Sequence, residues 1–376
     1  MSDIRSLRAV ATQFWINGMV FASFIPRLPE IRDRIEIDLA TLGLLLTLGS
    51  LGGLAGSAIC GPVIQRFGTR RAMIGGAIGL IVTLPLIGLA SGPMVFLLGL
   101  VILHLFDVVV DVAMNMQASW LSARQPTPVI NRLHGLWSAG TVVGGLGASA
   151  AASRLSLQAH LLAVAAVLAM TLARVAPRLL PTDEPPPETS ENEPARRSSR
   201  MAAIVVAVLA IAAIAMEVTP ADWATLRLAD DLAASDGVAG LGFVAVTSGM
   251  VIGRFSGDRL TVALGSATLI RLAVLMSMTG LIVGGLSPAL VPSIVGFAFA
   301  GLGASVLFPR LYDDAAQAPG RPGAALAALT AGIRIGAFVV PVTVGALANT
   351  GSLSVGAAMI VVVVPSAAVI MALTRR

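Results

Sequence analysis

The sequence has no lysine, a single cysteine and few charged side chains, and each scarcity excludes a class of protein. Only 12% of the 376 residues are charged, whereas 56% are hydrophobic. A soluble domain of this length needs far more polar surface, so lipid must solvate much of the chain. Cys60 alone can form neither an intrachain disulfide nor a cysteine-based metal site. The composition therefore predicts a polytopic membrane protein.

The basic residues and histidines give no sign of a nucleic-acid or metal site. All 25 basic residues are arginines, and they stand singly between apolar runs rather than on one wettable basic face. His104, His134 and His160 share no short spacing typical of metal ligands. No G-x-x-x-x-G-K-S/T loop and no nucleophile–base constellation is present, so neither an ATP-driven pump nor an enzyme is expected. We expect no cofactor, no metal and no nucleic-acid partner.

Apolar runs long enough to cross a bilayer recur along the chain. A helix needs about 20 residues to cross roughly 30 Å of hydrocarbon. The polar stretch 178–200 contains Pro185-Pro186-Pro187 and is typical of a flexible linker. We therefore expect an all-α protein with two six-helix bundles, residues 1–177 and 201–376, joined by a linker at 178–200. The predicted spans are 9–26, 41–63, 72–91, 93–119, 133–153 and 157–177, then 201–223, 238–256, 262–286, 289–312, 323–349 and 352–373.

Arginine placement predicts the orientation. The apolar stretch 9–25 lacks a small-x-small cleavage site after it, so we expect an uncleaved first span. Most arginines at span ends, Arg254 among them, lie on one side of the predicted topology. Because basic residues are in excess on the cytoplasmic side, both termini are predicted to lie inside. We also expect a monomer in the bacterial inner membrane. The opposite side has five arginines: Arg27, Arg32, Arg34, Arg154 and Arg227.

Glycines four residues apart recur at matching places in the two predicted bundles. Each pair removes side chains from one helix face and lets a neighbouring backbone approach. Their recurrence in every third span indicates an internal repeat. The pairs are Gly49/Gly53 and Gly52/Gly56 in the second span, Gly140/Gly144 in the fifth, Gly249/Gly253 in the eighth and Gly332/Gly336 in the eleventh.

Two loops, one in each half, resemble the signature loop of the major facilitator superfamily, and the resemblance covers nearly the whole chain. The family loop reads G-x-x-x-D-R-x-G-x-R, and residues 61–70 match it at Gly61, Arg66, Gly68 and Arg70, with Gln65 in place of the aspartate. In the second half, the corresponding loop contains Gly253, Asp258 and Arg259. The resemblance implies a transporter with a major-facilitator-type fold, in which these loops latch the bundles on the cytoplasmic side. The missing aspartate implies a weaker latch in the first half.

Further stretches resemble a narrower branch, the fucose-permease-like and YbjJ-type inner-membrane proteins. They are WING at 15–18 with PRLP at 26–29, DVAMNMQ at 111–117, HGLWS at 134–138, and Glu217 with Asp222-Trp223. This branch resemblance carries little information about the substrate.

Polar residues within the fourth span are candidates for proton coupling. His104, Asp107, Asp111 and Asn115 fall on one helical stripe, with Asp107 near mid-membrane. Buried charges in a span are costly and usually mark a cavity or a partner. Two carboxylates on one stripe repel when both are ionised, and proton coupling requires a group that loads and releases a proton. Alternatively, Asp111 and Asn115 pair with the start of the fifth span at His134.

Three more spans contribute candidate residues. Asn17 in the first span either binds a polar solute or satisfies a backbone carbonyl. Glu217 lies in the seventh span, and the family resemblance implies that this span lines a cavity. Arg334 lies near the middle of the eleventh span with no acid in its own helix, so a carboxylate or an anionic substrate must be close. Its candidate partners are Asp107, Asp111 and Glu217.

Three residues are candidates for gating. His134 either relays protons with Asp111 or is simply hydrated at a span end. Trp137 either stacks on a sugar or packs against a neighbouring helix. Trp223 either gates the outer side or, with Asp222, anchors the span at the interface.

These observations favour a secondary transporter that uses alternating access. The leading hypothesis is proton-coupled movement of a small polar solute, a sugar or an organic anion. Export of amphipathic drugs or metabolites is the second hypothesis, and a non-transporting membrane sensor is the third.

Overall fold

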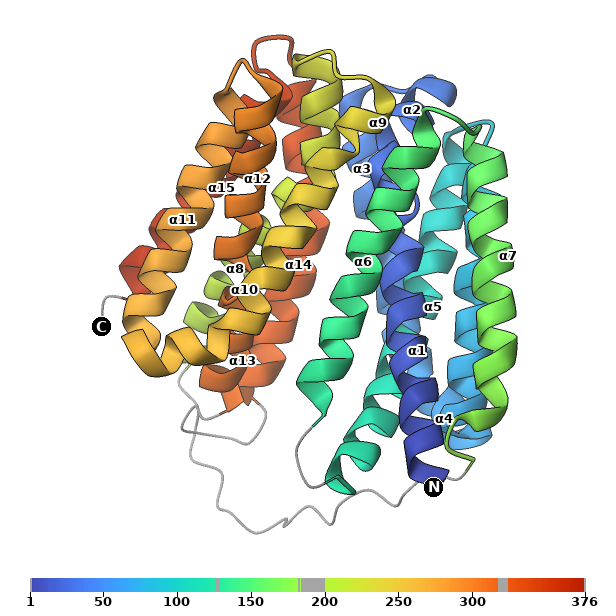
Figure 1. Ribbon diagram of the computed structural model, residues 1–376. Coiled ribbons are helices and arrows are strands. Elements are labelled where there is room, and N and C mark those ends of the chain that lie inside the picture. The colour runs from blue at the N-terminus through green and yellow to red at the C-terminus, as the bar shows by residue number, and fades with distance from the viewer. Residues whose placement is uncertain (1, 126–128, 182, 184–199, 317–323, 375–376) are drawn as a thin grey trace. The chain divides into compact units, whose positions relative to one another are not determined.

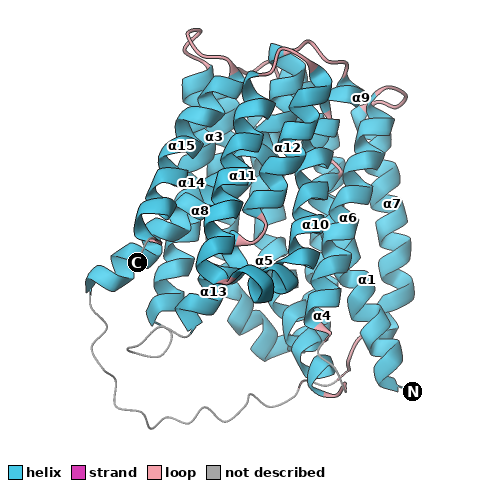
Figure 2. Cartoon of the chain, turned by 60° about the vertical axis from the view of Figure 1, so that its left-hand side comes forward, coloured by secondary structure: helices cyan, strands magenta, loops and turns pink. Residues whose placement is uncertain are grey.

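The computed structural model describes residues 2–125, 129–181, 183, 200–316 and 324–374 (Figure 1). Every regular element among them is a helix, as Figure 2 shows. The described chain divides into two compact units, each treated by itself below. Unit 1 comprises Met1–Asp38, Leu44–Pro185 and Ser235–Leu241, and unit 2 comprises Leu39–Gly43, Pro186–Ala234 and Gly242–Arg376. Most of the predicted linker, residues 182 and 184–199, lies outside the described residues.

The chain runs through eight helical elements from Ser2 to Val175. The long ones carry the apolar runs predicted from the sequence, and a short 3-10 turn, η2 (Ala176–Arg178), follows the last of them. The elements are α1 (Ser2–Ala22), η1 (Ile25–Arg27), α2 (Leu28–Arg34), α3 (Leu39–Gly49), α4 (Leu51–Gly88), α5 (Pro93–Ala123), α6 (Ile130–Ala152) and α7 (Leu157–Val175).

The second half repeats this plan after residue 200. A π-helical turn, η3 (Arg227–Asp231), follows its first helix. The helices are α8 (Arg200–Leu226), α9 (Asp236–Ala239), α10 (Leu241–Leu264), α11 (Ser266–Leu286), α12 (Leu290–Ala304), α13 (Leu307–Ala316), α14 (Ala324–Ala348) and α15 (Val355–Leu373).

Twelve helical segments of the described residues are long enough to cross a membrane. Ten stretches of the described residues have both the length and the apolar composition that crossing requires. One of them, Leu39–Gly88, has 50 residues and contains two crossings, because Gly68 breaks α4 with a φ of 79°. The more polar α6 has 23 residues and is about 35 Å long, which adds the twelfth. The predicted all-α fold with about twelve spans is confirmed.

Several predicted boundaries are wrong, and two of them matter for the site. The first span was predicted from residue 9, but α1 begins at Ser2, so Arg5 and Arg8 are helical. The eighth span was predicted to end at 256, but α10 continues to Leu264. Arg254 therefore lies inside a helix rather than at its end. Arginine has a high helix propensity, so basic residues prolong a helix beyond its apolar run.

The paired glycines pack one helix backbone closely on another within each unit. In unit 1, Gly18 of α1 faces the carbonyl oxygen of Trp137, and a Cβ atom at Gly140 of α6 would lie 2.5 Å from the carbonyl oxygen of Trp15. In unit 2, Gly332 of α14 faces the carbonyl oxygen of Ala207 on α8. The fifth and eleventh spans thus pack in the same way on the first span of their own unit, as the repeat predicted.

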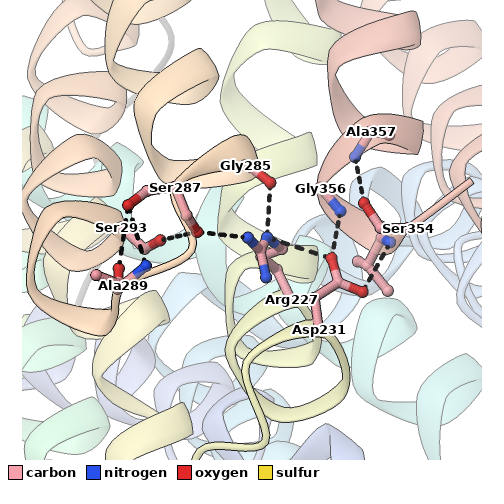
Figure 3. A network of polar contacts seen from close by, with 10 residues as sticks. Arg227, Asp231, Gly285, Ser287, Ala289, Ser293, Ser354, Gly356 and Ala357 are labelled. Atoms are coloured by element: carbon pink, nitrogen blue, oxygen red, sulfur yellow. Dashed lines mark hydrogen bonds and ion pairs between the residues drawn. The ribbon is translucent and has the colours of Figure 1, made fainter.

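In each unit, one arginine donates a hydrogen bond to a carbonyl oxygen at the end of a helix. In unit 2, Arg227 is buried and its Nε donates a 2.7 Å hydrogen bond to the carbonyl oxygen of Gly285, at the end of α11 (Figure 3). Asp231 forms an ion pair with this arginine and accepts a 3.0 Å hydrogen bond from the N–H of Gly356, in the first turn of α15. In unit 1, Arg34 donates a 2.9 Å hydrogen bond to the carbonyl oxygen of Gly88, at the end of α4. Each arginine satisfies a helix-end carbonyl that has no partner within its own helix.

Candidate functional site

Three of the predicted residues meet inside unit 1, on three different helices. Asn17 of α1 is 3% exposed, and its side-chain amide donates a 3.0 Å hydrogen bond to Oδ1 of Asp107 on α5. The indole Nε1 of Trp137 on α6 donates a 2.8 Å hydrogen bond to Oδ1 of Asn17. We call these three residues the Asn17 cluster. Asn17 uses its donor toward a carboxylate and its acceptor toward an indole, so its amide orientation is fixed from both sides.

The close approach of α1 and α6 explains why these side chains meet. Gly18 follows Asn17 directly and faces the carbonyl oxygen of Trp137. Any larger side chain at this position would push the two helices apart and move the indole away from the amide. The glycine pattern of the sequence and the polar cluster are therefore two parts of one helix contact.

A second polar amide lies one turn before Asn17. Gln13 is fully buried, and neither amide atom of its side chain has a hydrogen-bond partner among the described residues. Residues four apart share one helix face, so Gln13 and Asn17 lie on the same side of α1. A buried amide without partners is costly unless water or a solute bonds to it. Sequence reasoning missed Gln13, although a polar residue in an apolar helix was the available signal.

The rest of the predicted stripe on α5 does not join the Asn17 cluster. The side-chain amide of Asn115 donates a 3.0 Å hydrogen bond to Oδ1 of Asp111, one turn away on the same helix. Nδ1 of His104 donates to the carbonyl oxygen of Leu100 at 2.8 Å. The His134 ring packs edge-on against the Phe14 ring at 5.1 Å, and the pairing of Asp111 and Asn115 with His134 stays a prediction. Asp111 is exposed, whereas Asp107 is directed toward α1.

In unit 2, the structure corrects the predicted pairing of Glu217. Its Oε1 lies 3.3 Å from Nη2 of Arg254 on α10, so Arg254 rather than Arg334 is its partner. The other carboxylate oxygen of Glu217 is buried without a partner among the described residues. Arg334 is the eleventh residue of α14. Arg254 was missed because the predicted span ended two residues after it.

The Trp223 side chain is buried rather than exposed at a membrane–water interface. Its side chain is fully buried within α8, and its indole N–H has no partner in the described part of the chain. A Cβ atom at Gly345 of α14 would lie 3.2 Å from its ring. The alternative of an interfacial anchor is therefore wrong for Trp223. The gating alternative stays a prediction.

The first signature loop is held by a residue that the sequence analysis did not single out. Gly68 turns the chain, and the N–H of Thr69, the next residue, donates hydrogen bonds of 3.1 and 3.0 Å to the carboxylate of Asp183. The Thr69 hydroxyl donates to the same carboxylate at 2.6 Å. Gln117 of α5 donates to this hydroxyl at 3.0 Å. Asp183 thus caps the second part of α4, next to the loop that lacks the family aspartate.

The other signature residues also lie in helical segments, with Gly61 and Arg66 before the break at Gly68 and Arg70 after it. Gly61, Arg66 and Arg70 are all part of α4, and the Arg66 guanidinium lies 5.4 Å from the centre of the Phe67 ring. Gly253 packs against the carbonyl oxygen of Leu302 on α12. Arg259 is exposed near the end of α10, and the side chain of Asp258 lies outside the described part of the structure. The described residues contain no group of three His, Cys, Asp or Glu side chains that could hold a metal ion.

In the described part of the chain, the membrane-length helices and the polar groups inside each unit define a polytopic α-helical membrane protein. The chain belongs to the Major Facilitator Superfamily, whose profile matches residues 10–341. It is 29% identical to the membrane protein MosC of Rhizobium meliloti over 83% of this chain and 76% of MosC. It is 28% identical to an uncharacterized MFS-type transporter of Yersinia pestis over 91% of this chain and 88% of that protein.

Solved structures share the fold at low sequence identity. A mutant of the nucleoside transporter NupG matches with a TM-score of 0.75 at 12% identity, covering 98% of both chains. A bacterial homolog of the human lysosomal transporter Spinster matches with a TM-score of 0.71 at 16% identity, covering 98% of this chain and 96% of that one. The protein is an MFS transporter.

Proposed function

We propose that the protein is a secondary transporter of a small polar solute, a sugar or an organic anion, driven by the proton gradient through alternating access. We place it in the fucose-permease-like and YbjJ-type branch, as a monomer in the bacterial inner membrane with both termini inside. The observation that carries the proposal is the Asn17 cluster, with a carboxylate, an amide and an indole bonded across three helices. Gln13 adds unsatisfied donor and acceptor groups on the same helix face.

Asp107 is the group best placed to couple a proton to helix packing. When the carboxylate is ionised, its bond from the Asn17 amide is charge-assisted and strong. Protonation removes the charge and weakens this bond between α5 and α1. Because Asn17 also accepts from Trp137, the change reaches α6. Proton loading at Asp107 would then alter how three helices of unit 1 hold one another and a bound solute.

A second candidate function is export of an amphipathic compound. Its support is a pocket of about 900 Å³ in unit 2, on α10, α11 and α12, whose lining is almost entirely apolar. Leu272, Met276 and Phe299 are among the lining residues. Such a surface binds an apolar group rather than a sugar.

Uptake into vesicles tests the leading proposal. Candidate sugars, organic acids, nucleosides and drugs are first screened by thermal shift, since a ligand of the native state raises its apparent stability. Liposomes with purified protein and an internal pH dye then report proton movement with each hit. We expect Asp107→Asn to abolish proton-driven uptake while solute exchange without a gradient continues. Asp33→Asn, at an exposed carboxylate paired with Arg32, is the matched control and should leave uptake unchanged.

Two results would contradict the proposal. If Asp107→Asn takes up solute with the gradient as the unchanged protein does, Asp107 does not couple protons. If only apolar drugs shift the unfolding temperature and move across the membrane, the export function replaces the leading one.

A further inference from the structure

A pocket in unit 1, at the N-terminal end of α1, is lined by three arginines. It has a volume of about 610 Å³ and lies where the first turns of α1 meet the end of α7 and η2. Arg5, Arg8 and Thr12 recur at the i, i+3 and i+7 positions of α1 and so share one helix face. Arg178 reaches it from η2. The lining residues are Arg5, Arg8, Ala9, Thr12, Val175 and Arg178.

These three guanidinium groups have no acidic partner among the described residues. Elsewhere in the protein, the arginines at 27, 124, 227 and 254 each form an ion pair. The carboxylate nearest in sequence, Asp3, pairs with Arg124 at 3.1 Å. Three positive charges around one pocket repel one another, so an anion bound between them would relieve that repulsion. Guanidinium groups suit phosphate because they can form two parallel hydrogen bonds to it.

The neighbouring surface of α7 places this pocket at the edge of the hydrocarbon. Leu162, Val167 and Met170 are exposed on α7 and present apolar side chains to the surroundings. Arg178 follows Met170 by eight residues, about 12 Å along a helix. A surface that changes from apolar to basic over this distance matches the change from acyl chains to headgroups. Ala9 and Val175 give the pocket an apolar wall beside its charges.

We propose that this pocket binds the phosphate headgroup of an anionic phospholipid. The three guanidinium groups hold the phosphate, and the acyl chains lie along the apolar outer face of α7. Basic pockets between membrane helices are known to bind anionic headgroups in this way. The volume lies in the range of small-molecule sites. The pocket shares no residue with the Asn17 cluster, so a test of lipid binding does not depend on the identity of the transported solute or on proton coupling.

Native mass spectrometry of the full chain in detergent tests the site, with phosphatidylglycerol, phosphatidylcholine and inorganic phosphate as separate probes. We expect one molecule of phosphatidylglycerol to bind more tightly than phosphatidylcholine. Replacing Arg5, Arg8 or Arg178 singly by Gln should weaken this binding about fivefold each, and the triple variant about a hundredfold. Raising the salt from about 0.15 M to about 1 M should also weaken it. The control is the triple variant Arg71→Gln, Arg154→Gln and Arg271→Gln, which removes the same charge from exposed arginines elsewhere.

The control variant should keep the tight site. The proposal is overturned if both triple variants bind phosphatidylglycerol equally, or if phosphatidylcholine binds the unchanged protein as tightly. It is also overturned if inorganic phosphate displaces the lipid at equal concentration, because the pocket is then a site for a free anion and not for a lipid. The single variants keep the test decisive if the triple variant fails to fold.

Discussion

Single arginines in this protein differ widely in how deeply their ion pairs are buried. Arg227 is 4% exposed and bonds two carbonyl oxygens and one carboxylate, joining η3 to the end of α11. Arg124 also pairs with an aspartate, Asp3, but that pair is exposed. Breaking a buried pair leaves the remaining charge and carbonyl oxygens unsatisfied, whereas water replaces the partner of an exposed one.

We therefore expect Arg227→Gln to destabilise the protein by about 3 kcal/mol, because Asp231 and two carbonyl oxygens lose their donor. Arg124→Gln should cost at most about 1 kcal/mol. Thermal unfolding of the purified variants by intrinsic fluorescence measures both. Equal unfolding temperatures for the two variants would show that the network in Figure 3 contributes no more than a surface pair.

The residues of the candidate site could be chosen from the sequence, but their partners could not. Asn17, Asp107 and Trp137 stand out because polar and large side chains are rare in apolar helices. Their meeting depends on how closely α1 approaches α6, which helical periodicity within one span does not report. For the same reason the sequence grouped Asp107 with its helix neighbour Asp111. It also named Glu217 only among three candidate partners of Arg334 and did not connect it with Arg254.

At the scale of helices, close packing depends on glycines at the contact and not on glycine content. Gly140 is buried, and a Cβ atom there would lie 2.5 Å from the carbonyl oxygen of Trp15. Gly147 lies two turns further along the same helix, is exposed, and would meet no atom within 4 Å. Comparing substitutions at these two positions therefore separates the effect of glycine on helix packing from its effect on helix propensity.

Gly140→Ala should destabilise the protein by about 1–3 kcal/mol and weaken solute binding, because α6 must move away from α1 and carry Trp137 with it. Gly147→Ala should instead be neutral or stabilise by about 0.5–1 kcal/mol, since alanine favours the helix. Unfolding temperature and solute affinity are measured for both. A Gly140→Ala protein as stable as the Gly147→Ala protein would rule out the tight contact.

Helix number was predictable and helix ends were not. Each crossing needs about 20 apolar residues, so an error of a few residues in a boundary does not change the predicted number of crossings. The ends depend on single contacts, such as the bonds from Thr69 to Asp183 that begin a helix within a predicted loop. A contact across 114 residues leaves no local pattern.

At the scale of the whole chain, the two halves share a plan that the arginines also follow. Arg34 and Arg227 bond to the ends of the third helices of their own units. Of the five arginines on the side opposite the predicted cytoplasmic one, Arg27, Arg32 and Arg227 each form an ion pair. On the predicted cytoplasmic side, Arg124, Arg254 and Arg310 also form ion pairs, so ion pairing does not distinguish the two sides. The orientation stays a prediction from the number of arginines on each side.

Cysteine labelling in intact cells tests this orientation. In a Cys60→Ser background, Ser352→Cys and Thr374→Cys place thiols just before and just after α15. We expect a membrane-impermeant maleimide to label Ser352→Cys in intact cells, and Thr374→Cys only after the membrane is opened. The reverse pattern would invert the topology, and labelling of both in intact cells would mean that α15 does not cross.

The cap on Thr69 has a consequence for the order of biosynthesis. Its carboxylate, Asp183, leaves the ribosome 114 residues after Thr69 and after all six crossing helices of the first half. A nascent chain released at residue 177 would contain those helices but leave the Thr69 N–H without its acceptor, whereas a chain released at residue 185 would be complete. The hydrogen bonds that complete the first half of this transporter therefore come from a residue synthesised after its last membrane helix.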